Sequence, residues 1–480
     1  MKIAFSEIIG ADPQTIDSAS ALSQSMIIAI TKGRLAPGTR LPSVNKIAET
    51  VQLNRLTVLK AMDELDIEGW VVKKPRSGIF VSDNLPVDMP LGIGQLDDDR
   101  QPLPPLTMPD IIGSRQNFFR LSLNDGYPDY RLFPVQEVAR AYSTAFKDHA
   151  DKASLLYYDV YGQEELREAL ATYVHQTRSI RCSAENTMVT RGSTLGIYLV
   201  AKTVCQRGET IAMADPGYRS ARQSFEAEGF RVVSIRVDEQ GMVTDHLREV
   251  LRRESVKLIY VTPHHQYPTT VTLSAERRME LLKLAEEHNT YILEDDYDFD
   301  FQYDRRPILP MASIDQLHRV IYIGGFSKAL SPAIRLGYVV AGATIIREMG
   351  KWRRIIDRQG DSIPELAFAK LLRNGIIDKA IRKAIRVYKA RRDAAEALFR
   401  SELAGKITLY PCRGGLAFWA RINRPPESIA ALVDRAHRKQ LFLLQPARLL
   451  GYEGQHTRMG FASMTEGEME EAVAIIGAVW

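Results

Sequence analysis

The sequence predicts an α/β protein in which a small helical N-terminal domain is joined by a linker to a large domain containing a mostly parallel sheet. Three observations support this prediction. From about residue 121 onward, short apolar runs alternate with helix-length segments, as in parallel sheets covered by helices. The first 82 residues instead show helical periodicity followed by two short strand-like runs, and a proline-rich stretch separates the two regions.

Residues 1–82 are expected to form the small domain. Ser43 and Asn54 stand where helix N-caps are expected, each directly before a segment with helical character. The expected elements are helices over residues 21–33, 44–51 and 55–69, and a hairpin over residues 70–83. Helices followed by a hairpin make a winged helix-turn-helix, which commonly places one helix in the major groove of DNA.

The third helix of this domain is expected to meet a double-stranded DNA operator with its N-terminal residues. Arg55 is suited to a phosphate or a guanine edge, and Thr57 to a phosphate. The turn of the hairpin carries basic residues suited to the minor groove. The candidate DNA-binding residues are Asn45, Asn54, Arg55, Thr57, Lys73, Lys74 and Arg76. The alternative is a winged helix that contacts another protein.

Residues 83–120 contain repeated prolines and an acidic run over 97–99, with few apolar clusters. This composition is typical of an extended, semi-rigid linker. An ordered arm packed on a neighbouring surface is the alternative. Residues 121–480 then form the large domain.

The large domain contains the residue types that an aldehyde cofactor with a phosphate and a ring nitrogen requires. Lys328 can form a Schiff base with the aldehyde. A strand followed by "RGSTLG" places backbone amides at a helix N-terminus, a favourable phosphate site, and Arg335 adds a guanidinium. Asp295 can pair with the ring nitrogen. The candidate cofactor-binding residues are Gly192, Ser193, Thr194, Tyr218, Asp295, Tyr297, Ser327, Lys328, Arg335 and Tyr157, with Lys328 as the reactive group.

The N-terminal domain resembles the GntR family of regulators through "LPS" at 41–43, "RLTV" at 55–58 and "SGIFV" at 77–81. That family usually has arginine where this chain has Asn45, which removes one DNA contact. It usually has glycine where this chain has Arg76, which adds a contact in the wing.

The large domain resembles the fold-type I aminotransferases, which carry pyridoxal 5′-phosphate, through "GYPDYRLFP", "EDDYD", "SKALSPAIR" and "TRMGFA". The resemblance implies that Tyr157 reaches the phosphate of the other subunit of a homodimer and that Arg458 binds an effector carboxylate. The chain departs from the family pattern in having Tyr267 before Pro268 and Gly325 three residues before the lysine.

A GntR-like domain, a linker and an aminotransferase-like domain together resemble the MocR subfamily of transcription regulators. This resemblance implies a head-to-tail homodimer that binds pyridoxal 5′-phosphate and senses an amine, an amino acid or the cofactor itself. Two alternatives are a working aminotransferase with an appended DNA-binding module and a dimerisation scaffold that has lost its cofactor. The sequence leaves the effector, the operator and the sign of regulation open.

Composition places few further constraints on function. The net charge of +4 is too small to indicate nucleic-acid binding by itself. The three cysteines have no metal-like spacing, and no metal site is expected. No apolar run reaches the roughly 18 residues that a membrane span needs, so a cytoplasmic protein without membrane contact is expected.

Overall fold

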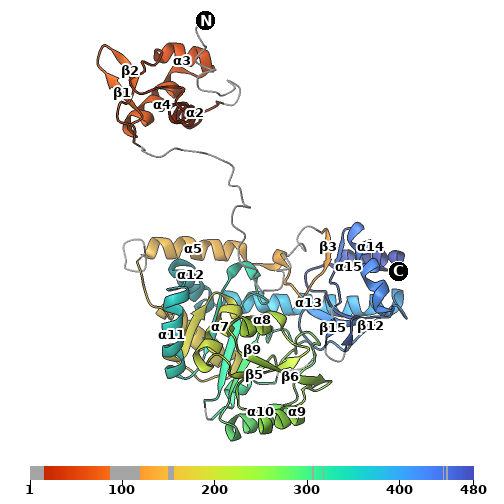
Figure 1. Cartoon of the computed structure of the whole chain (residues 1–480). Coiled ribbons are helices and arrows are strands. Elements are labelled where there is room, and N and C mark those ends of the chain that lie inside the picture. Colours follow the sequence, from red (N-terminus) through yellow and green to blue (C-terminus); the bar gives the residue numbers. More distant parts are fainter. Residues whose placement is uncertain are drawn as a thin grey trace. The chain divides into compact units, whose positions relative to one another are not determined.

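The chain divides into two compact units, Met1–Thr107 and Met108–Trp480, each of which is described by itself (Figure 1). The computed structural model describes residues 16–86, 119–149, 156–304, 308–316, 318–446, 448–449 and 452–480. Most of the expected linker, residues 87–118, lies outside the described residues.

The N-terminal unit has the helices and the hairpin that the sequence predicts. Its elements are α2 (Ala19–Thr31), α3 (Val44–Val51), α4 (Arg55–Ile67), β1 (Val71–Lys74) and β2 (Gly78–Val81). The side chain of Ser43 accepts the Lys46 amide at the start of α3, and that of Asn54 accepts the Thr57 amide at the start of α4. Leu22, Met26, Val58 and Met62 are fully buried, so α2 and α4 share one apolar core.

The C-terminal unit contains an eight-stranded sheet. In spatial order its strands are β4 (Thr187–Thr190), β11 (Gly337–Val340), β10 (Val320–Gly325), β9 (Tyr291–Asp296), β8 (Val256–Val261), β5 (Thr210–Asp215), β6 (Arg231–Asp238) and β7 (Gly241–Met242). Pairing is parallel from β10 through β6 and antiparallel on both sides of β11 and between β6 and β7. The mostly parallel sheet predicted from the sequence is therefore confirmed.

Helices cover both faces of this sheet. They are α6 (Glu164–Arg178), α7 (Gly192–Val204), α8 (Arg219–Ala227), α9 (Thr244–Arg253), α10 (Ala275–Glu287), α11 (Ala343–Ile356) and α12 (Ser362–Arg373). Helix α5 (Val135–His149) packs against α12. Side chains alternate along a strand, so Ile211 and Met213 of β5 pack with α7, α8 and α11, whereas Ala212 and Ala214 pack with α9 and α10.

A smaller part of the same unit joins the beginning of the large domain to the end of the chain. Its elements are α13 (Ile376–Glu402), β12 (Ile407–Leu409), β13 (Ala417–Ile422), α14 (Pro426–Arg438), β14 (Leu441–Leu443), β15 (Arg448–Leu449), β16 (Tyr452–Glu453), β17 (His456–Gly460) and α15 (Glu466–Val479). The early strand β3 (Leu121–Leu123) pairs in parallel with β14. Because of this pairing, the residues after β3 lie close to those of β17.

Candidate functional site

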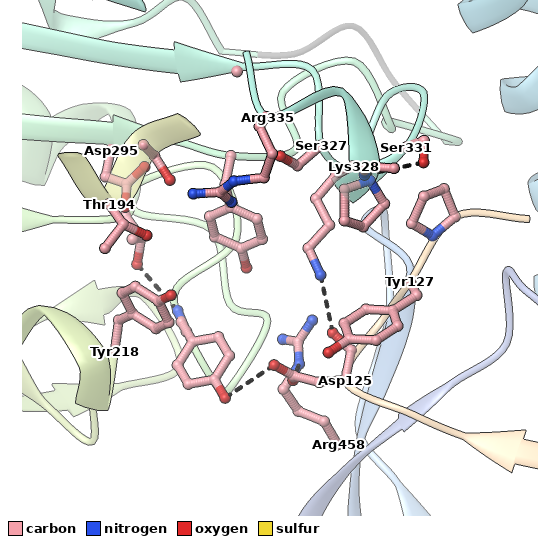
Figure 2. A pocket seen from close by; sticks show the side chains of 18 of the residues that line it. Asp125, Tyr127, Thr194, Tyr218, Asp295, Ser327, Lys328, Ser331, Arg335 and Arg458 are labelled. Atoms are coloured by element: carbon pink, nitrogen blue, oxygen red, sulfur yellow. Dashed lines mark hydrogen bonds and ion pairs between the residues drawn. The ribbon is translucent and has the colours of Figure 1, made fainter. Parts of the chain in front are cut away.

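A cavity of about 630 Å³ lies at the carboxyl ends of the central parallel strands, where open α/β sheets bind ligands. Figure 2 shows its lining. Among the predicted residues, it is lined by Ser193, Thr194, Tyr218, Asp295, Tyr297, Ser327, Lys328, Arg335 and Arg458. The fold thus gathers residues that are up to 265 positions apart in the sequence, from Ser193 to Arg458.

Lys328 follows β10 and extends into the cavity. Its Nζ atom donates hydrogen bonds to the carbonyl oxygens of Gly126 at 2.8 Å and Asp125 at 3.3 Å. Burial lowers the pKa of Lys328 to about 8, although the nearby carboxylate of Asp125 opposes the shift. A lysine with a lowered pKa has a larger neutral fraction near neutral pH, and the neutral amine is the form that attacks an aldehyde.

Asp295 lies near the end of β9 and is almost fully buried. Tyr260, on the neighbouring strand β8, donates a 2.7 Å hydrogen bond to its Oδ2 atom. Oδ1 is buried and has no hydrogen-bond donor among the described residues. Burial raises the pKa of Asp295 to about 7, while the Tyr260 hydrogen bond opposes that rise. This carboxylate is therefore suited to a ligand that donates a proton to Oδ1.

The N-terminus of α7 and Arg335 form the cationic end of the cavity. Ser193 and Thr194 line it from the first turn of the helix. Gly192 has a φ of +76°, and a Cβ atom there would lie 3.3 Å from Nη1 of Arg335. Glycine therefore satisfies the backbone conformation and lets the guanidinium lie against the helix start. Helix amides together with a guanidinium favour an anion such as a phosphate.

The opposite end of the cavity contains an ion pair that sequence reasoning missed. Nε of Arg458, on β17, lies 2.6 Å from Oδ1 of Asp125, and Nη1 donates to the Pro268 carbonyl at 3.2 Å. The hydroxyl of Tyr267 donates to the other carboxylate oxygen at 3.2 Å. Arg458 thus already pairs with a carboxylate of its own chain, and its binding of an effector carboxylate stays a prediction.

Two predicted cofactor residues have other contacts within this chain. The hydroxyl of Tyr297 donates to the His265 carbonyl at 2.8 Å, so its proton is already used. Tyr157 is 74% exposed and does not line the cavity. The Arg358 guanidinium carbon lies 3.7 Å from the centre of its ring. The reach of Tyr157 into a second subunit stays a prediction.

The candidate DNA-binding surface is centred on the start of α4. Arg55 and Asn45 are exposed, and so is Leu56, between Arg55 and Thr57. The Oδ1 atom of Asn54 accepts both the amide and the hydroxyl of Thr57, at 2.7 and 2.9 Å. Asn54 therefore holds the first turn of the helix in place and orients the Thr57 hydroxyl.

The wing shows one difference from expectation. The Lys73 ammonium pairs with Asp63 and lies 3.7 Å from Asp66, so acids of α4 offset its charge. Lys74 and Arg76 are exposed. Arg76 has a φ of +61°, in the left-handed region that favours glycine, which accords with the glycine usually found there in the resembling family.

Tyr260 and Asp125 were not among the predicted site residues. Tyr260 had a detectable signal, because it stands near the end of a strand-like run that precedes the run containing Asp295. Adjacent parallel strands bring such positions together. Asp125 had no local signal, since its partner Arg458 is 333 residues away in the sequence.

The described ranges contain no group of three or more potential metal ligands. Among the helices of those same ranges, none is long and apolar enough to cross a membrane.

Fold and site together define a DNA-binding domain of the winged-helix class joined to an aminotransferase-like domain. The chain belongs to the aminotransferase class I and II family, whose model matches residues 117–476, and the model of bacterial regulatory proteins of the gntR family matches residues 19–81. This combination is the MocR-type architecture of GntR-family regulators.

Two transcription regulators and a solved aminotransferase are similar to this chain. The uncharacterized HTH-type transcriptional regulator YdeL of Bacillus subtilis is 28% identical over 454 residues, covering 94% of each chain. The probable rhizopine catabolism regulatory protein MocR of Rhizobium meliloti is 29% identical, covering 85% of this chain and 82% of that protein. A Pyrococcus horikoshii kynurenine aminotransferase solved with PMP is 25% identical, with a TM-score of 0.67, covering 75% of this chain and 90% of its own.

The cavity fits pyridoxal 5′-phosphate, which is the cofactor of this chain. The start of α7, Ser327 and Arg335 would hold the phosphate, and the unpaired Oδ1 of Asp295 would accept the proton on the ring nitrogen. Lys328 would hold the aldehyde. When bound, the cofactor supplies a reactive aldehyde and an electron-withdrawing ring. The chain itself supplies burial, orientation and the amine.

Proposed function

We propose that this protein is a transcription regulator that binds a DNA operator and senses a small amine or amino acid through pyridoxal 5′-phosphate. One observation carries the proposal. The same chain has an exposed helix start suited to DNA and a cavity with a buried amine. Arg55 is exposed at the first position of α4, and Lys328 is buried beside the half-paired carboxylate of Asp295.

The sensing chemistry follows from Lys328. Only a ligand with a primary amine can exchange with the lysine at the cofactor aldehyde, so the effector carries such an amine. Arg458 is almost fully buried in the lining of the cavity, and we assign it to an acidic group of the effector. Both assignments agree with the roles implied by the resemblance to aminotransferases.

The two units would communicate through the linker over residues 83–120, within a head-to-tail homodimer. In such a dimer Tyr157 would reach the phosphate of the partner subunit, which accords with its exposure and its absence from the cavity lining of its own chain. The protein would act in the cytoplasm, where its operator DNA lies. Exchange at Lys328 would change the affinity for DNA.

The test is selection of duplex sequences from a random DNA library by the full-length protein loaded with cofactor. We expect one enriched sequence class, bound more weakly by Arg55→Ala at low salt and with a salt slope lower by about one, because one phosphate contact is lost. Lys351→Ala, which removes an exposed lysine of α11, is the control. No enrichment, or equal affinity of Arg55→Ala and wild type at every salt concentration, would contradict the proposal.

A further inference from the structure

Asp125 and Arg458 form a buried ion pair at the end of the cavity opposite the N-terminus of α7 (Figure 2). The Arg458 side chain is 3% exposed and that of Asp125 is 25% exposed, and both line the cavity. Oδ1 of Asp125 is buried against Nε of Arg458 at 2.6 Å, and the Asp125 side chain also lines the cavity. Because the carboxylate is partly exposed and its two oxygens offer several lone pairs, it can accept a further hydrogen bond from a ligand in the cavity.

Three other hydrogen bonds fix the position of Asp125 and of the next residue, Gly126. The hydroxyl of Tyr267 donates to its Oδ2 atom, and Nζ of Lys328 donates to its backbone carbonyl and to that of Gly126. The Arg458 guanidinium also lies over the ring of Tyr267, with 5.1 Å between its central carbon and the ring centre. The carboxylate thus belongs to the wall of the cavity beside the reactive amine.

The charges of Asp125 and Arg458 already balance each other before any effector arrives. Arg458 contributes one positive charge and Asp125 one negative charge. An effector with a carboxylate but no second ammonium would add a second negative group beside Asp125. Like charges in a buried site repel each other. An effector that also carries an ammonium would pair its acid with Arg458 and its ammonium with Asp125, so that every buried charge has a partner.

We propose that Asp125 is a specificity-determining residue that selects a diamino acid, that is, an effector with a carboxylate, an amine that exchanges at Lys328 and a second ammonium. This inference rests on the proposed function and narrows its effector class. The ammonium donates to the carboxylate of Asp125, while the terminal nitrogens of Arg458 donate to the acid.

The test compares matched ligands that differ only in the second amine: ornithine against norvaline, and lysine against norleucine. Binding to the full-length protein loaded with cofactor is measured by calorimetry, and the change in DNA affinity is a second readout. We expect at least one diamino acid to bind tighter than its counterpart. Asp125→Asn should reduce that preference by about 10-fold or more, the effect of one charge-assisted hydrogen bond.

Two further variants show whether a lost preference is specific to Asp125. Asp245→Asn removes an equally sized acid from an exposed site on α9 and should leave the preference unchanged. Arg458→Lys should weaken both members of each ligand pair. Equal binding of the matched ligands by wild type, or the same preference in Asp125→Asn, would overturn this inference alone. A wild-type protein whose cofactor attachment and DNA affinity respond to no amine would overturn the proposed function and this inference with it.

Discussion

The hydroxyl of Tyr260 donates a 2.7 Å hydrogen bond to Oδ2 of Asp295, while Oδ1 of the same buried carboxylate has no donor in the described part of the chain. The two oxygens therefore have different roles. One is bound by the protein, and we propose that the other accepts the proton of the cofactor's ring nitrogen.

Asp295→Asn should weaken cofactor retention. The negative charge that stabilises a protonated ring is lost, and a charge-assisted hydrogen bond contributes about 1.5–3 kcal/mol, equivalent to roughly 10- to 150-fold in affinity. Equilibrium dialysis of pyridoxal 5′-phosphate against wild type and variant measures this change. Asp245→Asn is the matched control. Equal retention by Asp295→Asn and wild type would show that another group pairs with the ring.

Tyr260→Phe should make cofactor retention more dependent on pH. The lost hydrogen bond stabilised the ionised carboxylate, so the pKa of Asp295 should rise above its value of about 7. More of the carboxyl is then protonated near neutral pH, and a neutral carboxyl cannot balance the ring charge. The deficit relative to wild type should be larger at about pH 6.5 than at about pH 8.5. A deficit independent of pH would indicate a packing effect instead.

The free energy of unfolding of the cofactor-free protein should depend on pH through the ionisation of Asp295. Its pKa is raised from 3.8 to about 7, so the folded state binds a proton more tightly than the unfolded state. The free energy of unfolding therefore falls as pH rises from about 4 to about 7. In Asp295→Asn this contribution is absent. Urea unfolding at several pH values should show a shallower fall in the variant, and parallel curves would contradict the raised pKa.

Lys73 and Lys74 allow a direct comparison of two wing lysines in DNA binding. They are adjacent in the sequence, but they differ in their ion pairing. Asp63 and Asp66 offset the charge of Lys73, whereas Lys74 is exposed. Lys74→Ala should reduce the salt slope of DNA binding by about one, and Lys73→Ala should reduce it by less. Fluorescence anisotropy over a salt series measures both slopes. A larger reduction in Lys73→Ala would show that its ion pair opens on DNA.

Local patterns were sufficient to predict the elements of the N-terminal unit and most strands of the large sheet. The caps at Ser43 and Asn54 and the short apolar runs of the sheet depend on neighbouring residues, and the structure contains each of them. Local patterns also identified candidate residues that line one cavity, since a lysine, a helix start and a carboxylate each stand at the end of a strand-like run. The domain boundaries at 82 and 121 stay predictions, because most of the linker lies outside the described residues.

The rest of the site depends on contacts between distant segments. Asp125 meets Arg458 only because β3 pairs with β14 and thereby lies near β17, and no spacing rule encodes that contact. The pairing of Lys73 with Asp63 likewise depends on how the wing folds against α4. Sequence patterns identify which chemistry is present, whereas tertiary packing decides which charges are already paired.

The measurement that tests the account most directly is the DNA affinity of the full-length, cofactor-loaded protein with and without amino acids and simple amines. It is made for wild type, Lys328→Ala and the control Lys351→Ala. We expect at least one amine to change wild-type DNA affinity by about 5- to 150-fold, the usual range for coupled sites. Lys351→Ala should respond in the same way, and Lys328→Ala should not respond. An unchanged affinity with every amine, or an equal response in Lys328→Ala, would contradict sensing through Lys328.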